Sequence, residues 1–158
     1  MTFGEALPET SLVLDNDTFT HWRTGRPVVQ KAITAYIARL KRPPSMTTIT
    51  LFEALFGVEN SFAKDKITAE EAGRFKARIR QLSEESPLLP FEQTSAMISA
   101  YIYARLSQAE KNKHWRDLFV LGTALAHGHG IATQNRKDFE LLAGHLPPGY
   151  FLRLATWR

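Results

Sequence analysis

Carboxylate side chains stand beside or inside apolar segments at several places in this chain. A buried charge without a partner costs several kcal/mol, so a folded protein keeps such groups only where something balances them. If the fold brings these carboxylates together, a metal ion is the partner that explains them best. The positions are Asp15, Asp17, Glu53, Asp117 and Asp138.

The first of these carboxylates ends a predicted strand. Residues 11–15 read Ser-Leu-Val-Leu-Asp, a short apolar run that predicts a buried parallel strand. Asp15 then lies at the carboxyl end of that strand. In open α/β sheets this is the edge where ligands bind.

Two further carboxylates belong to predicted helices. Glu53 lies in TLFEALFGVE, where apolar residues surround it on nearly every side, so a solvated helix face explains it poorly. Asp117 begins the apolar run of residues 118–126, which predicts a helix that ends at Gly128. The alternative for Asp117 is a structural N-terminal cap of this helix.

Residues 130–139 predict a brief strand, a polar turn and the start of a short helix. Asn135 or Asp138 would then lie at the carboxyl end of a strand, as Asp15 does. The alternative for Asn135 is a helix cap.

The remaining pattern predicts an α/β fold. Amphipathic spacing predicts helices over residues 29–40 and 93–109, and Thr68 with Glu71 forms a capping box that opens another. Residues 150–154 predict a last strand. Short apolar strands that alternate with longer helices predict a three-layer α/β/α sandwich with a mainly parallel central sheet.

Composition indicates one domain. The 158 residues are 44% hydrophobic and 23% charged, which fits a single domain over residues 11–158 behind a flexible lead-in of residues 1–10. That lead-in is polar, unlike a signal peptide or membrane segment, so we expect a cytoplasmic protein. The absence of cysteine excludes disulfides, thiolate zinc sites and a cysteine nucleophile. The net charge of +4 favours the approach of a polyanion.

Four segments, in chain order, carry a resemblance to a known family. LVLDNDTFTHW is similar to the opening strand and metal-binding aspartate of PIN domains, and TLFEALFGVE is similar to their glutamate helix. RDLFVLGTALAHG resembles the helix with their third acid, and IATQNRKDF resembles their closing turn. The likeness runs from Leu12 to about Leu154 and is closest to the VapC-type toxins of bacterial toxin–antitoxin pairs.

The resemblance implies a metal-dependent endoribonuclease that uses Mg²⁺ or Mn²⁺. Asp15, Glu53 and Asp117 match the three principal acids of the family. Asn135 and Asp138 both qualify for the fourth position, in the closing turn. The resemblance further implies an RNA substrate, a small antitoxin partner and a homodimer.

Two details of this resemblance concern particular residues. Asn16 stands where the family usually has a small hydroxyl residue that helps to position the metal. Exposed apolar residues of the helix over 93–109 are the candidates for the homodimer contact.

Metal-dependent hydrolysis of a phosphodiester requires these residue types. Hydrolysis of a phosphodiester needs an activated water and neutralised charge on the phosphate, which Mg²⁺ or Mn²⁺ supplies. These hard cations take oxygen ligands, so a cluster of carboxylates without histidine or cysteine suits them. The guanidinium fork of Arg116 matches a phosphate, and Arg136 and Lys137 are further RNA-contact candidates. His21 and His114 lie near the proposed acids and are candidates for touching phosphate when protonated.

The richest basic stretch is residues 74–80. Phe75 and Ile79 are predicted to face inward there, while Arg74 and Arg78 point outward. An ordinary solvated helix face accounts for this pattern.

Two other functions fit parts of the sequence. In a phosphohydrolase of the haloacid dehalogenase class, Asp15 would be a covalent nucleophile and Asp17 a general acid. Phe19 stands where that class has threonine or valine, and no later pair of acids follows the pattern. The non-enzymatic alternative is a catalytically degenerate PIN-like module that binds RNA or protein, against which the presence of all three principal acids counts.

Overall fold

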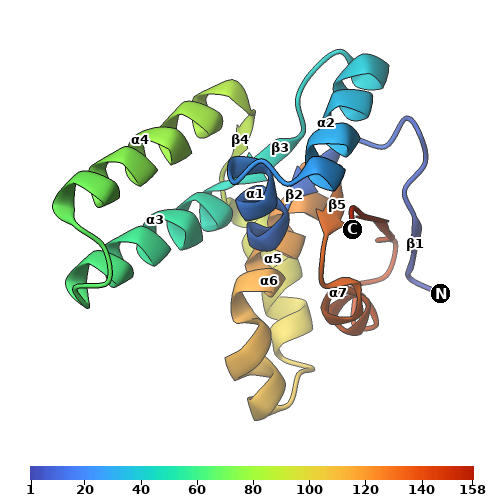
Figure 1. Ribbon diagram of the computed structural model, residues 1–158. Coiled ribbons are helices and arrows are strands. Elements are labelled where there is room, and N and C mark those ends of the chain that lie inside the picture. Colours follow the sequence, from blue (N-terminus) through green and yellow to red (C-terminus); the bar gives the residue numbers. More distant parts are fainter.

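The computed structural model describes residues 1–158 and contains a single six-stranded sheet with seven helices (Figure 1). All strand pairs are parallel, and the strand order is β1-β6-β5-β2-β3-β4. The elements in chain order are β1 (Phe3–Glu5), β2 (Leu12–Leu14), α1 (Asn16–Arg23), α2 (Pro27–Leu40), β3 (Ser45–Thr47), α3 (Thr48–Ala63), α4 (Ala69–Glu85), β4 (Leu88–Leu89), α5 (Gln93–Tyr103), α6 (Gln108–Ala126), β5 (Gly130–Thr133), α7 (Arg136–Ala143) and β6 (Leu152–Thr156).

Helices cover both faces of the sheet. Alternate residues of a strand point to opposite faces, and β2 follows this rule because Leu12 and Leu14 pack with α1 to α4 while Val13 packs with α5, α6 and α7. The core therefore consists of two apolar clusters with the sheet between them. This arrangement confirms the predicted three-layer α/β/α sandwich, and the sheet is parallel throughout.

The order of the strands creates a crevice at one edge of the sheet. β3 and β4 lie on one side of β2, and β5 and β6 lie on the other side. The order of the strands therefore reverses between the neighbouring strands β2 and β5. In open α/β sheets, ligands bind beyond the carboxyl ends of the two strands at such a reversal of strand order. Asp15 directly follows β2, and Asn135 follows β5 closely.

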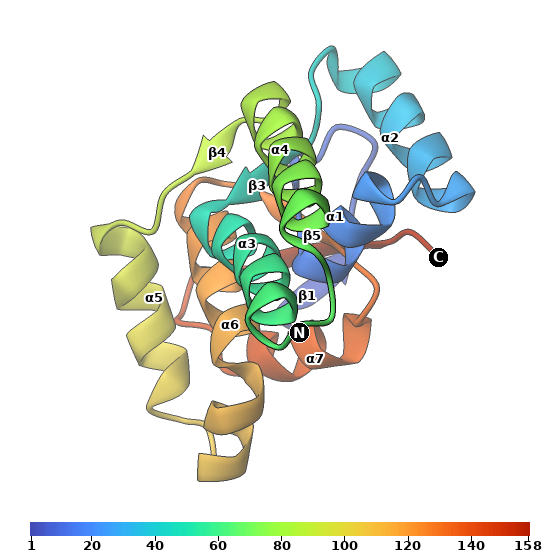
Figure 2. The ribbon, with the colours of Figure 1, turned by 60° about the vertical axis from the view of Figure 1, so that its left-hand side comes forward.

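Two helices form an arm that projects from the sheet. α3 and α4 lie side by side in both ribbon views, and α5 and α6 form a second such pair (Figure 1, Figure 2). The predicted capping box of α4 is present, since Thr68 and Glu71 each accept a hydrogen bond of 3.1 Å from the other's backbone N–H. The helix predicted over residues 29–40 is also confirmed, as α2.

Three predicted boundaries are wrong. The helix predicted over residues 93–109 ends at Tyr103, because Ser107 caps a new helix and accepts a hydrogen bond from the N–H of Glu110 at 3.2 Å. The helix that contains Asp117 therefore begins at Gln108, and the polar residues before Asp117 belong to its first turns. The last strand covers Leu152–Thr156 rather than residues 150–154.

The amino-terminal segment also differs from the expectation. Residues 3–5, predicted as part of a flexible lead-in, form β1 and pair in parallel with β6, with Phe3 opposite Leu152. The polar composition of the residues around β1 does not prevent this pairing, because an edge strand is held by its backbone hydrogen bonds. β1 therefore extends the sheet to residues that precede position 11.

No helix of the structure combines the length and the hydrophobicity that crossing a membrane requires.

Candidate metal centre

Asp15 ties three elements together at the crevice. It is the N-cap of α1, where its Oδ1 accepts a hydrogen bond of 2.9 Å from the N–H of Thr18. Its Oδ2 accepts a hydrogen bond of 2.6 Å from Oγ1 of Thr133, the last residue of β5. Only 2% of the residue is exposed. Burial raises the pKa of Asp15, and the hydrogen bonds from Thr133 and Thr18 oppose that rise.

Glu53 reaches the same crevice from α3. The first turn of α3 is fixed to β2 because Oγ1 of Thr50 donates a hydrogen bond of 3.3 Å to the carbonyl of Leu14. Glu53 lies one turn later on the same side of the helix. Burial raises the pKa of Glu53 to about 7, the Arg116 guanidinium lowers it, and the charge of Asp15 raises it further.

The surroundings of Glu53 differ from the prediction. The sequence places apolar residues around Glu53 on nearly every side, but the rings of Phe52 and Phe56 are about half exposed. They stack on one another with centroids 6.0 Å apart. Glu53 is thus half-buried at the root of the arm rather than enclosed in a core.

Asp117 lies in the middle of α6, so it is not an N-terminal cap. Its pKa is raised to about 7, chiefly by burial and then by the negative charges of Asp15 and Glu53. Asp138 and Asp17 raise the pKa in the same direction. These carboxylates are therefore close enough to repel one another, and Asp117 is central among them.

The closing turn contributes two side chains in different ways. The N–H of Asn135 donates to Oγ1 of Thr133 at 2.8 Å, and its side-chain Nδ2 donates to Oδ2 of Asp17 at 2.5 Å. Asn135 precedes α7 but its side chain makes no capping hydrogen bond, so the alternative of a helix cap does not describe that side chain. Asp138 lies in the first turn of α7.

A polar cavity of about 180 Å³ collects most of these groups. No hydrophobic residue lines it. Asp17 was among the carboxylates that a shared metal ion would explain, but it was not predicted as a ligand, and Lys113 was not predicted at this site at all. The lining residues are Asp15, Asn16, Asp17, Glu53, Lys113, Arg116, Asp117 and Asn135.

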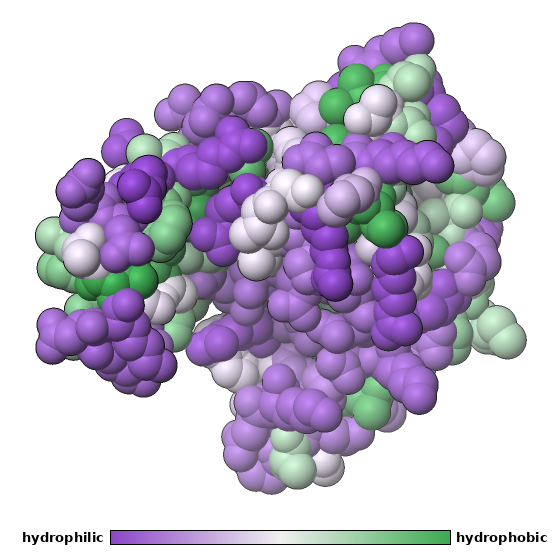
Figure 3. All heavy atoms as spheres, viewed as in Figure 1, coloured by the Kyte–Doolittle hydropathy of each residue, from purple (hydrophilic) through white to green (hydrophobic).

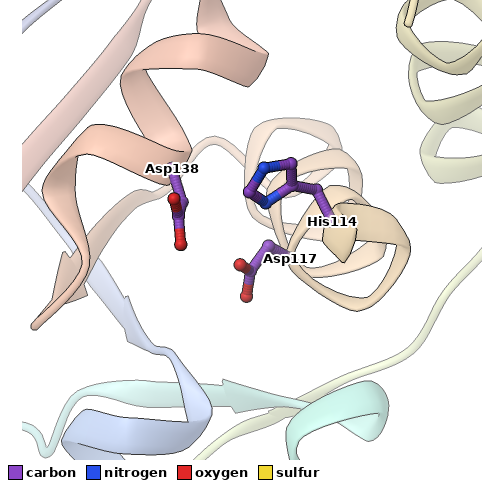
Figure 4. Close-up of side chains that lie close together, drawn as sticks. All are labelled: His114, Asp117 and Asp138. Carbon is purple, nitrogen blue, oxygen red and sulfur yellow. The ribbon is translucent and has the colours of Figure 1, made fainter. Parts of the chain in front are cut away.

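A second grouping shares Asp117 with the cavity. His114 is one turn before Asp117 on α6, and Asp138 faces both from α7 (Figure 4). One potential ligand atom from each of the three lies within 4.8 Å of those of the others. His114 is only 4% exposed, and its Nδ1 is buried without a hydrogen-bond partner.

The three residues that were predicted to contact RNA have different surroundings from one another. Arg116 lines the polar cavity, its guanidinium lies 4.9 Å from the ring centroid of Trp115, and its Nε has no hydrogen-bond partner. Arg136 is held by ion pairs of 2.6 Å to Glu5 and to Glu140. Lys137 is exposed and does not line the cavity.

The donor set fits a hard divalent cation. Every principal acid offers carboxylate oxygens, which are the ligands that Mg²⁺ and Mn²⁺ take. Oδ1 of Asn16, at the same cavity, is a buried oxygen without a hydrogen-bond partner. A cation here would also relieve the repulsion that raises the pKa of Glu53 and Asp117.

Comparison with solved structures identifies the fold. No model of a protein family matches the chain, and no curated protein matches it by sequence. The structure is similar to that of DNA-bound VapBC from Salmonella typhimurium, with a TM-score of 0.68 and 21% identity over 94% of this chain and 99% of that chain. The fold is PIN-like.

Two more complexes support this PIN-like fold. VapBC-1 from nontypeable Haemophilus influenzae matches with a TM-score of 0.63 and 20% identity, over 92% of this chain and 97% of that chain. VapBC-5 from Mycobacterium tuberculosis, described as a member of the VapBC family of toxin-antitoxin systems, matches with a TM-score of 0.60 and 19% identity, over 94% of this chain and 98% of that chain. The chain thus spans nearly the whole length of each of these proteins.

Proposed function

We propose that this protein is a metal-dependent endoribonuclease and the toxin of a toxin–antitoxin pair, of the VapC type. The observation that carries the proposal is the convergence of Asp15, Glu53 and Asp117, from three separate elements, on one polar cavity at the carboxyl edge of a parallel sheet. The pKa of Glu53 and that of Asp117 are both raised to about 7 there. Acidic groups with perturbed pKa values in a cavity are typical of a functional site.

The cation would be held by Asp15, Glu53 and Asp117, with Asp138 as the further acid and Asn135 completing the site. When bound, Mg²⁺ or Mn²⁺ supplies charge neutralisation at the phosphate and lowers the pKa of a bound water. The chain's own part is to hold the carboxylates in place. Thr133 and Thr18 fix both oxygens of Asp15 by hydrogen bonds of 2.6 and 2.9 Å.

Two cations of the chain would bind the substrate at the cavity. Arg116 and Lys113 line it beside the acids, and both come from α6. No ion pair or side-chain hydrogen bond engages the guanidinium of Arg116, so its charge is not neutralised and remains available for a phosphate. Arg136 is a weaker candidate than Arg116 because Glu5 and Glu140 already neutralise it.

The geometry disfavours the dehalogenase-type alternative. Each oxygen of Asp15 accepts one hydrogen bond from the protein, which fits its positioning as a metal ligand. Asp17, which would be the general acid, accepts a hydrogen bond from Asn135 and is exposed. A metal site tolerates these bonds because a carboxylate oxygen has further lone pairs.

A small protein partner follows from the same proposal. Similar structures include a toxin-antitoxin complex from Klebsiella pneumoniae and FitAB bound to a DNA fragment. We propose that this chain likewise has a small antitoxin, and that an arginine of the antitoxin enters the acidic cavity and displaces the cation. Such a pair would work in the cytoplasm, where its RNA is found.

A homodimer is the third part of the proposal. An open apolar depression of about 460 Å³ lies between α5 and α6, lined by Phe91, Tyr103, Trp115, Phe119 and smaller residues. Met97 on α5 is 64% exposed. Exposed apolar side chains that gather on one face are typical of subunit contacts. Light scattering that shows a monomer at high concentration would contradict the dimer.

The test of the proposed function is cleavage of a pool of cellular RNAs with the cut sites mapped. Cleavage with Mg²⁺ or Mn²⁺, and its loss in chelator, are expected. Asp117→Asn should abolish it, whereas Glu84→Gln, which removes an exposed charge from α4, should not. Cleavage that persists in chelator would contradict the metal mechanism. RNA binding without any cleavage would favour the degenerate binding module.

A further inference from the structure

Three arginines face one space without a carboxylate among them. Arg23 at the end of α1, with Arg74 and Arg78 one turn apart on α4, lines a cavity of about 620 Å³ whose other lining residues are Thr24 and Phe75. None of the three arginines takes part in an ion pair. The one side-chain hydrogen bond among them runs from Arg78 to Gln81, at 3.1 Å.

This arrangement favours an anion in the cavity. Like charges that share a concave space raise its positive potential and attract polyanions. Arg23 is half-buried, burial lowers the pKa of its guanidinium, and its Nε has no hydrogen-bond partner. A phosphate group would supply the missing negative charge, and the guanidinium fork matches its geometry.

A third cavity, with lining residues in common with both, lies between the arginine cavity and the proposed catalytic site. A cavity of about 360 Å³ between α1 and α3 shares Arg23 and Phe75 with the arginine cavity. The same cavity shares Asn16 and Glu53 with the carboxylate cavity. The three cavities therefore lie in a row from the acids to the arginines, and we call this row the trough.

One residue of this trough has a position that the sequence did not predict. Phe75 was expected to face inward, but 36% of it is exposed and its ring lies at the junction of two cavities. The guanidinium of Arg74 is 5.7 Å from the centroid of this ring. Figure 3, in the same view as Figure 1, shows apolar atoms gathered on the α3–α4 arm among hydrophilic ones.

We infer that this trough binds the single-stranded RNA next to the phosphodiester that is cut. Arg23, Arg74 and Arg78 pair with backbone phosphates, and Phe75 offers its ring to a base. An aromatic face beside a row of cations is the arrangement that binds single-stranded nucleic acid without strict sequence preference. The inference rests on the proposed function, because it takes RNA as the substrate of the adjoining acids.

Binding measured without cleavage tests this inference. Fluorescence anisotropy would follow a labelled single-stranded RNA on the Asp117→Asn protein, which cannot cut it. One variant carries Arg23→Gln, Arg74→Gln and Arg78→Gln. The matched control carries Lys31→Gln, Arg39→Gln and Arg80→Gln, which remove the same charge from exposed positions outside the trough. Circular dichroism checks that both variants are folded. A further variant carries only Arg74→Gln and Arg78→Gln, so that it leaves the half-buried Arg23 unchanged.

The trough variant should bind RNA on the order of tenfold more weakly at physiological salt. The slope of the logarithm of its binding constant against the logarithm of the salt concentration should become less steep by about 2 units. The control should change far less. Phe75→Leu should weaken binding of single-stranded RNA more than of duplex RNA, because stacking needs an unpaired base.

Equal losses in the trough variant and the control would overturn the inference, and so would unchanged binding in Phe75→Leu. A polyglutamate peptide that displaces RNA at equal charge concentration would assign the trough to an acidic protein segment instead. The proposed function fails separately. If the wild-type protein binds RNA through the trough but never cuts it, the proposed function is wrong and the RNA-binding trough is retained. If the trough variant binds and cuts RNA normally, the trough inference is wrong and the proposed nuclease function is retained.

Discussion

Thr133 donates a hydrogen bond of 2.6 Å from Oγ1 to Oδ2 of Asp15, and the two residues lie 118 positions apart in the sequence. This bond joins the carboxyl ends of β2 and β5, where the strand order reverses. Thr133 also accepts a hydrogen bond of 2.8 Å from the N–H of Asn135. One buried hydroxyl therefore positions both the first acid and the closing turn.

Thr133→Val should reduce cleavage and stability together. Valine keeps the shape but leaves a buried carboxylate oxygen and a backbone N–H without their partner, a loss of about 1–3 kcal/mol. Thr133→Ser, which keeps the hydroxyl, should restore both. Chemical denaturation and RNA cleavage at saturating Mg²⁺ measure the two effects, and unaltered cleavage by Thr133→Val would show that Asp15 needs no such positioning.

Asp117→Asn should separate function from stability. The substitution removes the central charge of a group of carboxylates that raise one another's pKa, so the metal-free protein should melt at an equal or higher temperature. Cleavage should be lost. Mg²⁺ should raise the melting temperature of the wild type by mass action, and much less that of the variant. A variant that melts well below wild type without metal would assign a structural role to Asp117.

The stability of the metal-free protein should fall as the pH rises from about 4 to about 7. The pKa of Glu53 and that of Asp117 are raised to about 7 from 4.5 and 3.8. The folded state therefore binds more protons than the unfolded state in this window, and the free energy of unfolding decreases with pH. Denaturant titrations across this range measure it.

The same pH series contains its own controls. Saturating Mg²⁺ should remove most of the decline, because the cation stabilises the ionised acids. A Glu53→Gln, Asp117→Asn protein should show a much flatter profile. Capping hydrogen bonds lower the pKa of Glu71 and that of Glu110. These two groups therefore make the folded state more stable as the pH rises, but they do so at pH values below their unfolded pKa, where the decline caused by Glu53 and Asp117 has hardly begun. A metal-free wild type that gains stability from pH 5 to 7 would contradict the raised pKa values.

His114→Gln should change the choice between Mn²⁺ and Mg²⁺. The buried Nδ1 of His114 has no partner, and the imidazole lies beside Asp117 and Asp138. Imidazole is a better ligand for Mn²⁺ than for Mg²⁺, which prefers oxygen. Calorimetric titration should show a smaller preference for Mn²⁺ in the variant than in wild type. His129→Gln, at another histidine with an unpartnered Nδ1, is the matched control. Equal preferences in all three proteins would exclude a role for His114.

Local patterns in the sequence were enough to predict the class of fold and to single out the carboxylates of the candidate site. Short apolar strands and amphipathic helices in alternation predicted the three-layer sandwich, because the side-chain period of a buried strand differs from that of a helix. The carboxylates Asp15, Glu53 and Asp117 stood out because burial of an unpaired charge is costly. Both signals are local, so they could be read without coordinates.

The contacts that these side chains make depend on long-range packing. Asn135 contacts Asp17, and His114 lies beside Asp138, only because β5 and α7 return to the end of β2 through parallel pairing far along the chain. The same long-range packing neutralises Arg136 with Glu5. Local pattern cannot predict such contacts, because the pairing partners of strands and the faces of helices are set by the packing of the whole core.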